Sequence, residues 1–163
     1  MAVTIAVISD THQPRGTRTL PVRCVDLLRG ADLILHGGDF VSVGFLDELR
    51  ALGPPVEAVS GNMDEPALKE SLPKQRVVEI EGARIGMVHI PGPATGRSAR
   101  LRVKFPDCGA VIYGHTHVPE VGQDDGVWIL NPGSPTEKRK SPGHAMLVLE
   151  IEAGSVRPEL VEL

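Results

Sequence analysis

The sequence predicts an α/β fold in which two mixed β-sheets pack as a sandwich flanked by α-helices, forming one domain over residues 1–163. Apolar, β-branched runs alternate with helix-like stretches in the first half of the chain, whereas the second half is richer in strands. No linker, repeat or low-complexity tract divides the chain, and its length is enough for one sizeable core.

Five apolar, β-branched runs predict strands that are buried on both faces. Each run ends in a polar cluster instead of an ordinary turn. The five segments are VTIAVISDTH (3–12), ADLILHGGD (31–39), VEAVSGNMD (56–64), ARIGMVHIPG (83–92) and GAVIYGHTH (109–117).

Apolar residues at helical spacing predict helices between these strands. The stretches 22–30 and 43–53 both end at a glycine. Pro66 lies near the start of a short helix over 65–72, and the fourth helical stretch is 97–105. The alternation of strand and helix implies right-handed crossovers and mostly parallel strands in this part of the chain.

The second half of the chain predicts further strands. Segments 75–82 (QRVVEIEG) and 83–90 (ARIGMVHI) are separated by a glycine turn, which is typical of a hairpin. Segments 126–134 and 144–154 are also expected to be strands, and 155–163 is expected to pair with the latter.

Composition limits the class of protein. The formal net charge is −4 without a long run of like charges, which argues against an extended nucleic-acid surface or a membrane surface. An aromatic content of 3% argues against a platform of aromatic side chains that stacks the bases of single-stranded nucleic acid. No apolar run approaches the roughly 18 residues of a membrane span. Cys24 and Cys108 are expected to be reduced, buried thiols, so the expected location is the cytoplasm.

The polar clusters are predicted to gather at one edge, because ligands in open α/β folds lie outside the carboxyl ends of the strands. Residues i and i+2 of an extended segment point to the same side, so each D-x-H and H-x-H pair can face one cavity. Imidazole and carboxylate without thiolate suit Mn, Fe, Zn, Co or Ni, and seven ligands suit two ions that share a carboxylate. The candidate ligands are Asp10, His12, Asp39, Asn62, His89, His115 and His117.

The ordered clusters resemble the calcineurin-like metallophosphoesterase family, and within it the small bacterial and archaeal phosphodiesterases. The resemblance spans residues 5 to about 139 and implies a two-sheet sandwich flanked by helices. The segments that carry it are SDTH (9–12), GGD (37–39), GNMD (61–64), VHIPG (88–92), GHTH (114–117) and NPGSPTEKR (131–139).

The resemblance implies a role for each ligand and a reaction. It implies hydrolysis of small phosphodiesters by a hydroxide that bridges two divalent ions, with manganese favoured and Fe, Zn, Ni or Co as alternatives. Asn62 would also stabilise charge on the phosphate. The first ion would be held by Asp10, His12, Asp39 and His117, and the second by Asp39, Asn62, His89 and His115.

Two positions depart from the family pattern. Many members have, after the G-N pair, a histidine thought to protonate the leaving group, and this branch often has cysteine there. Here the residue is Met63, whose thioether cannot donate a proton. Ile90 and Pro91 follow His89, so the second imidazole that many members carry in that loop is absent. We therefore expect a slower enzyme that favours esters with good leaving groups.

The sequence offers further candidates outside the seven ligands. Asp64 is a candidate catalytic residue that orients a ligand or a water, with a helix cap as the alternative. Arg97 is a candidate phosphate-binding residue, as are Arg100 and Arg139, with a solvated surface as the alternative. His36 is expected to be a core histidine bonded to the backbone.

Two other functions stay open. The small retromer subunit, a eukaryotic branch of the family, is an interaction platform with an impaired metal site, so a scaffold without catalysis is the first alternative. A phosphomonoesterase is the second. Competent residues at all seven ligand positions favour the enzyme, whereas Met63 and the altered loop after His89 favour the scaffold modestly. The expected partner is a small phosphodiester substrate, with homo-oligomerisation left open.

Overall fold

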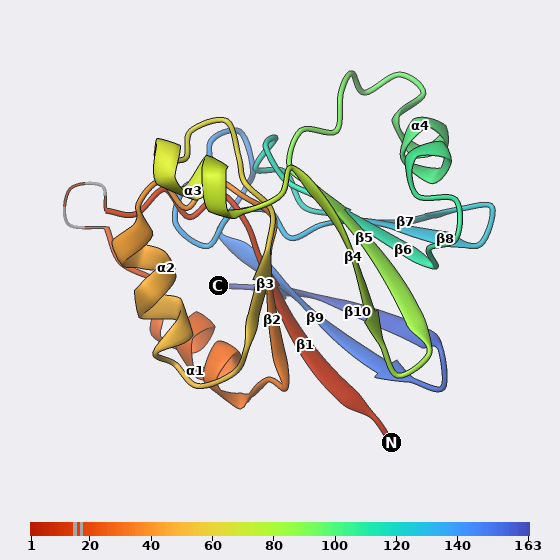
Figure 1. Cartoon of the computed structure of the whole chain (residues 1–163), viewed down its shortest axis with the longest axis horizontal. Helices are drawn as coiled ribbons and strands as arrows, with labels where there is room; N and C mark the ends of the chain where they lie inside the picture. The colour runs from red at the N-terminus through yellow and green to blue at the C-terminus, as the bar shows by residue number, and fades with distance from the viewer. Residues whose placement is uncertain (15, 17) are drawn as a thin grey trace.

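The computed structural model describes residues 1–14, 16 and 18–163. The described residues form two five-stranded sheets that pack face to face. Three helices cover the outer face of the first sheet and one helix covers the outer face of the second (Figure 1). This arrangement confirms the predicted sandwich of mixed sheets with flanking helices.

The first sheet contains the early parallel strands and the C-terminal hairpin. β1, β2 and β3 are parallel, as the strand–helix alternation predicted, and β9 runs antiparallel to both β1 and β10. The order across the sheet is β10 (Ser155–Glu162), β9 (Ala145–Glu152), β1 (Val3–Ile8), β2 (Leu33–His36) and β3 (Val56–Ala58).

The second sheet begins with the predicted hairpin of β4 and β5, and β5, β6 and β8 are parallel. Its order is β4 (Gln75–Ile80), β5 (Ala83–Val88), β6 (Ala110–Tyr113), β8 (Val127–Asn131) and β7 (Glu120–Asp124). Strand β7 was not predicted. Its sequence, EVGQD, contains one apolar side chain, because it is an edge strand with alternate residues exposed.

All four predicted helices are present: α1 (Val22–Gly30), α2 (Val43–Arg50), α3 (Pro66–Ser71) and α4 (Arg97–Lys104). Ser42 begins α2 by accepting a hydrogen bond from the backbone N–H of Phe45. Helix α2 ends three residues before the predicted Gly53, because the chain continues from Arg50 as a turn. In the described part of the chain, no helix is long and apolar enough to span a membrane.

Alternate side chains of the central strands enter two different cores. In β1, Ile5 and Val7 face the second sheet, whereas Ala6 and Ile8 face the helices α1 and α2. On the other side of the molecule, residues of α4 pack on β5, β6 and β8. Burial on both faces explains the continuous apolar runs in the sequence.

His36, the last residue of β2, is the core histidine that was predicted. Its ring is fully buried and stacks on Phe40, with 3.5 Å between ring centroids. Nδ1 accepts the backbone N–H of Gly38 at 3.0 Å, so the neutral ring carries its proton on Nε2, which donates to Thr11 Oγ1 at 3.0 Å. Burial lowers the pKa of His36 to about 3. The ring therefore joins the loops that follow β1 and β2.

We predict a stability loss in acid that depends on His36. The unfolded chain binds a proton at His36 below about pH 6.5, whereas the folded chain does not until about pH 3. The free energy of unfolding therefore decreases as the pH is lowered from about 6.5 to about 3. In urea unfolding, the difference in unfolding free energy between wild type and His36→Gln should shrink by about 2 kcal/mol from pH 7.5 to pH 5. A constant difference across these pH values would contradict the neutral, buried ring.

Candidate metal centre

The loops that follow β1, β2, β3, β5 and β6 meet at one end of the sandwich. As the polar clusters predicted, this arrangement brings together side chains from five segments that are far apart in the sequence. The side chains at this end include all seven candidate ligands: Asp10, His12, Asp39, Asn62, His89, His115 and His117.

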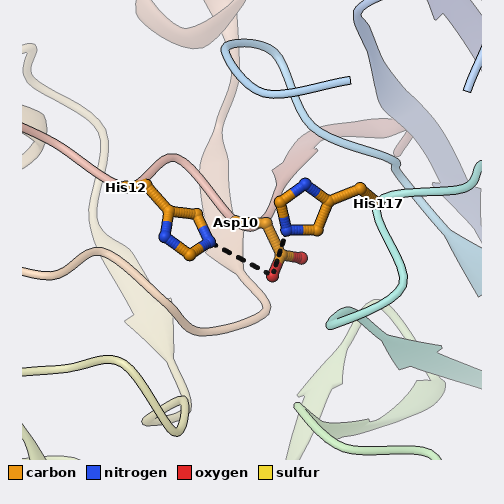
Figure 2. Close-up of side chains that lie close together, drawn as sticks. All are labelled: Asp10, His12 and His117. Carbon is orange, nitrogen blue, oxygen red and sulfur yellow. Dashed lines mark ion pairs between the residues drawn. The ribbon is translucent and has the colours of Figure 1, made fainter. Parts of the chain in front are cut away.

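The first group of donor atoms belongs to Asp10, His12 and His117, which are all buried. Asp10 Oδ1 lies 3.9 Å from His12 Nε2 and 3.4 Å from His117 Nε2. Figure 2 shows the two imidazoles pointing at the same carboxylate oxygen. Within the described residues, none of these three atoms has a hydrogen-bond partner. Buried polar atoms are rarely left unpaired, so this convergence needs a further partner.

The second group contains Asp39, His89 and His115, and Asn62 completes it. Asp39 Oδ2 lies 3.1 Å from His89 Nε2. Asn62 Oδ1 lies 3.1 Å from His89 Nε2 and 3.2 Å from His115 Nδ1. His115 and His117 therefore lie in different groups, as the resemblance implied.

Asp39 lies between the two groups. Its Oδ2 is 3.5 Å from His12 Nε2 in the first group and 3.1 Å from His89 Nε2 in the second. Its other oxygen, Oδ1, accepts the backbone N–H of Met63 at 2.8 Å. The carboxylate is thus oriented by one oxygen while the other faces both sets of donor atoms.

Backbone carbonyls set the tautomers of two histidines. His89 Nδ1 lies 2.7 Å from Gly37 O, and His117 Nδ1 lies 2.5 Å from Glu137 O. Because a carbonyl only accepts, Nδ1 carries a proton in both rings, so Nε2 is the nitrogen that can offer a lone pair to a metal ion at the centre. Histidines that bind metal ions are commonly oriented in this way.

The charges of the centre favour a cation. Burial alone would raise the pKa of Asp10, but contacts with His117 and His12 and the charge of His89 hold it well below its usual range. Burial would also raise the pKa of Asp39, but the hydrogen bond and charge of His89 lower it. Conversely, burial disfavours a charged His89, yet Asp39 and Asp10 raise its pKa overall. Positive charge is therefore stabilised between the two carboxylates.

The spacing of the donor atoms fits divalent metal ions. Two ligand atoms about 2.1 Å from one ion lie roughly 3.0–3.4 Å apart at octahedral or tetrahedral angles. Five of the separations given above lie between 3.1 and 3.5 Å. The donors are imidazole nitrogens and carboxylate or amide oxygens, a set that suits first-row transition metals.

Five candidate ligands have a left-handed backbone, which costs roughly 1–2 kcal/mol for each residue other than glycine. They are Asp10, His12, Asp39, His115 and His117, with φ angles of 57°, 47°, 62°, 73° and 63°. The D-x-H and H-x-H pairs are therefore not extended, which is contrary to the prediction from the sequence. The left-handed turn at His115 and His117 places the two rings in different groups.

Two glycines are required by close contacts inside the centre. A Cβ on Gly61 would lie 2.1 Å from Asp39 Oδ1, and a Cβ on Gly114 would lie 2.2 Å from Ser9 Oγ. The glycines of the GN and GH pairs therefore allow loops from different strands to approach one another.

Asp64 is buried and binds three backbone N–H groups, of Gly61 at 2.7 Å, Val41 at 2.8 Å and Asp39 at 3.2 Å. Val41 is β-branched and has a φ of 86°, which is a strained conformation. The alternative helix cap is not formed, because the N-cap of α3 is Glu65 and its end receives no side-chain hydrogen bond. This geometry supports a positioning role for Asp64, which holds the strained loop around Asp39.

The three candidate arginines differ in their surroundings. Arg97 donates to Gly92 O at 2.9 and 3.3 Å, and Arg100 donates to the carbonyls of Pro91 and Pro93. Both therefore hold the loop after β5. Arg139 is exposed, and its charge helps burial and His89 to lower the pKa of His115.

Sequence reasoning missed how the segment 131–139 supports the centre. Ser134 Oγ donates to Asp10 O at 2.8 Å, and Thr136 Oγ1 donates to Thr11 O at 2.7 Å. Glu137 accepts from His117 through its carbonyl, and its carboxylate lies 3.8 Å from His12 Nδ1. The only signal in the sequence was the resemblance of NPGSPTEKR to the phosphodiesterase branch.

The chain is similar to known proteins over nearly its whole length. Residues 3–154 match the family model described as the calcineurin-like phosphoesterase superfamily domain. A probable metallophosphoesterase of Methanothermobacter thermautotrophicus is 40% identical over 159 residues, covering 96% of this chain and 91% of that protein.

Solved structures are also similar over the whole chain. A Thermotoga maritima protein solved by NMR has 34% identity and a TM-score of 0.77, with 99% of each chain covered. Vps29 of Entamoeba histolytica in complex with zinc has 28% identity and a TM-score of 0.78, with 98% of each chain covered.

We predict that Asp64→Asn lowers the unfolding free energy by about 2–3 kcal/mol, because an amide cannot accept from all three backbone N–H groups. It should also weaken Mn²⁺ binding in calorimetry, since Asp39 loses its support. The matched control is Asp47→Asn on α2, where the side chain is 68% exposed and a change within about 0.5 kcal/mol is expected. Equal stability and Mn²⁺ affinity in wild type and Asp64→Asn would contradict the positioning role.

Proposed function

Because the chain belongs to the calcineurin-like phosphoesterase superfamily, we propose that it is a divalent-metal-dependent phosphodiesterase that acts on small phosphodiesters. The observation that carries the proposal is the convergence of Asp10 Oδ1, His12 Nε2 and His117 Nε2, three buried atoms without a hydrogen-bond partner among the described residues. Each such atom costs about 1–3 kcal/mol if it stays unpaired. A bound cation would remove that cost at all three positions.

The two groups would hold two ions that share Asp39. Bound divalent ions supply a water nucleophile of lowered pKa and neutralise the charge of the phosphoryl group. Manganese is the proposed native ion, with Fe, Zn, Ni or Co as alternatives, and the zinc complex of Vps29 supports a divalent ion in this fold. The proposed ligands are Asp10, His12, Asp39 and His117 for one ion, and Asp39, Asn62, His89 and His115 for the other.

Asn62 has a second proposed role toward the phosphate. Its Oδ1 faces His89 and His115, and among the described residues no hydrogen bond uses its amide N–H groups, which could donate to a phosphate oxygen. A donor held in this way stabilises charge that develops on the oxygen during displacement. Arg139 is the proposed source of additional positive charge near His115, whereas Arg97 would contribute to the phosphate site only through the loop that it holds.

Met63 would leave the departing oxygen without a proton donor. Its backbone N–H is used by Asp39 Oδ1, and its side chain is 55% exposed beside Asn62. The leaving group would therefore depart as an anion, which is fast only when its pKa is low.

One observation favours the scaffold alternative. Three large apolar side chains are exposed, each next in sequence to a residue of the centre: Met63 by 55%, Ile90 by 50% and Val118 by 45%. Exposed apolar side chains of this kind suit a protein partner. Metal binding without turnover of any phosphoester would favour a scaffold, and a higher rate on p-nitrophenyl phosphate than on the diester would favour a phosphomonoesterase.

With Mn²⁺, the wild-type protein should hydrolyse bis-p-nitrophenyl phosphate, and Asp39→Asn should lower kcat by roughly 10²-fold or more. The reason is that a neutral amide cannot neutralise two adjacent cations. Asp47→Asn removes one exposed carboxylate elsewhere and should keep the wild-type rate. Equal rates for wild type and Asp39→Asn would contradict the proposed centre.

Replacing Met63 by histidine should restore acid assistance. For phosphodiesters with a poor alkoxide leaving group, Met63→His should raise kcat by roughly 10²-fold, with a much smaller effect on p-nitrophenyl esters. The control is Met63→Gln, which has a similar size and no titratable proton. The kcat of the two variants should be compared over substrates whose leaving groups have increasing pKa. The same dependence of kcat on leaving-group pKa in both variants would show that position 63 does not reach the leaving group.

A further inference from the structure

A cavity of about 440 Å³ opens beside the second donor group, and Asn62 and His89 form part of its wall. We infer that this cavity binds a second phosphate group, so that the substrate is a phosphodiester in which one arm carries a further phosphate. The inference rests on the proposed function and specifies its substrate class.

The charge of the cavity carries the inference. Lys69, Lys74 and Lys104 line it, and they come from α3, from the turn before β4 and from the end of α4. No acidic residue lines it, and the described residues place no carboxylate in an ion pair with these lysines. Three of the five lysines of a chain with net charge −4 therefore gather at one cavity without a negative partner.

The ammonium groups remain able to bind an anion. Lys104 Nζ donates to Gln75 Oε1 at 3.2 Å, which uses one of its three N–H donors. All three lysine side chains are exposed, so a phosphate reaches them without removing a buried group from its partner. Ammonium groups are common phosphate ligands and act as point charges.

The remaining wall suits the body of an organic arm. Val88 and the half-exposed Ile90 provide apolar surface in the wall of the same cavity. The volume lies within the roughly 300–1,000 Å³ of small-molecule sites. A phosphodiester bound at the donor atoms would place one ester arm along this apolar wall and its terminal phosphate among the lysines.

The test compares two substrates that share a leaving group. They are thymidine 5′-(p-nitrophenyl phosphate) and its 3′-phosphorylated derivative, assayed with Mn²⁺. The selectivity is the ratio of their kcat/KM values. We expect a selectivity of about tenfold or more for the phosphorylated substrate, since each exposed charge pair contributes a factor of roughly two to five. The selectivity should fall as ionic strength rises.

Substitutions of the three lysines test whether they cause the selectivity. Lys69→Met, Lys74→Met and Lys104→Met together should bring the ratio close to one, and the three Lys→Arg changes should keep it. Arg50→Met removes an exposed charge on α2, outside the cavity, and should leave the ratio as in wild type. A wild-type ratio near one, or a ratio that survives loss of the three lysines, overturns the inference while leaving the phosphodiesterase intact.

A binding measurement separates the inference from the proposed function. Metal-free protein in EDTA is titrated with thymidine 3′-phosphate and followed by NMR chemical shifts. We expect shifts at residues of the cavity and a loss of affinity of about tenfold or more in the triple Met variant. If neither substrate is hydrolysed, the proposed function fails, and this titration alone decides the inference. Absence of binding, or equal binding by the variant, overturns it.

Discussion

The centre depends on how the carboxylate of Asp39 is held. One oxygen accepts the N–H of Met63 at 2.8 Å, which leaves the other oxygen between His12 and His89. The backbone N–H of Asp39 is bound in turn by Asp64. Because these contacts come from the loops after β1, β2, β3 and β5, a shift of any one loop would separate the two groups of donor atoms.

The rest of the fold stabilises the strained loops of the centre. Five candidate ligands have a left-handed backbone, which is unfavourable for residues other than glycine. The parallel register of β1 and β2, with Ile8 beside His36, places the ends of both strands at the same level. The strain of these loops is opposed by three features: the burial of both strands on two faces, the hydrogen bonds of His36 and the hydrogen bonds of Asp64. Bound cations would stabilise the loops further, because they bind only the folded arrangement.

The sequence predicted the strands, the helices and the seven candidate ligands because apolar runs and polar clusters are local patterns. It did not predict β7, whose edge position removes the apolar signal, or the turn that separates His115 from His117. Two of the three backbone groups that Asp64 binds belong to the loop after β2, so nothing near Asp64 in the sequence shows these contacts. Arg97 binds a carbonyl of its own loop, five residues earlier, and this contact depends on a loop conformation that no local pattern predicts. The sequence also did not predict the lysine cavity, because its three lysines come from separate parts of the chain.

The central claim is that Asp39 joins two divalent ions, and anomalous diffraction from crystals grown with Mn²⁺ tests it most directly. The account predicts two manganese peaks roughly 3.5–4 Å apart, one on each side of Asp39 and each in contact with one group of donor atoms. Density without an anomalous peak at Asp39, or manganese bound only away from both groups, would contradict the account.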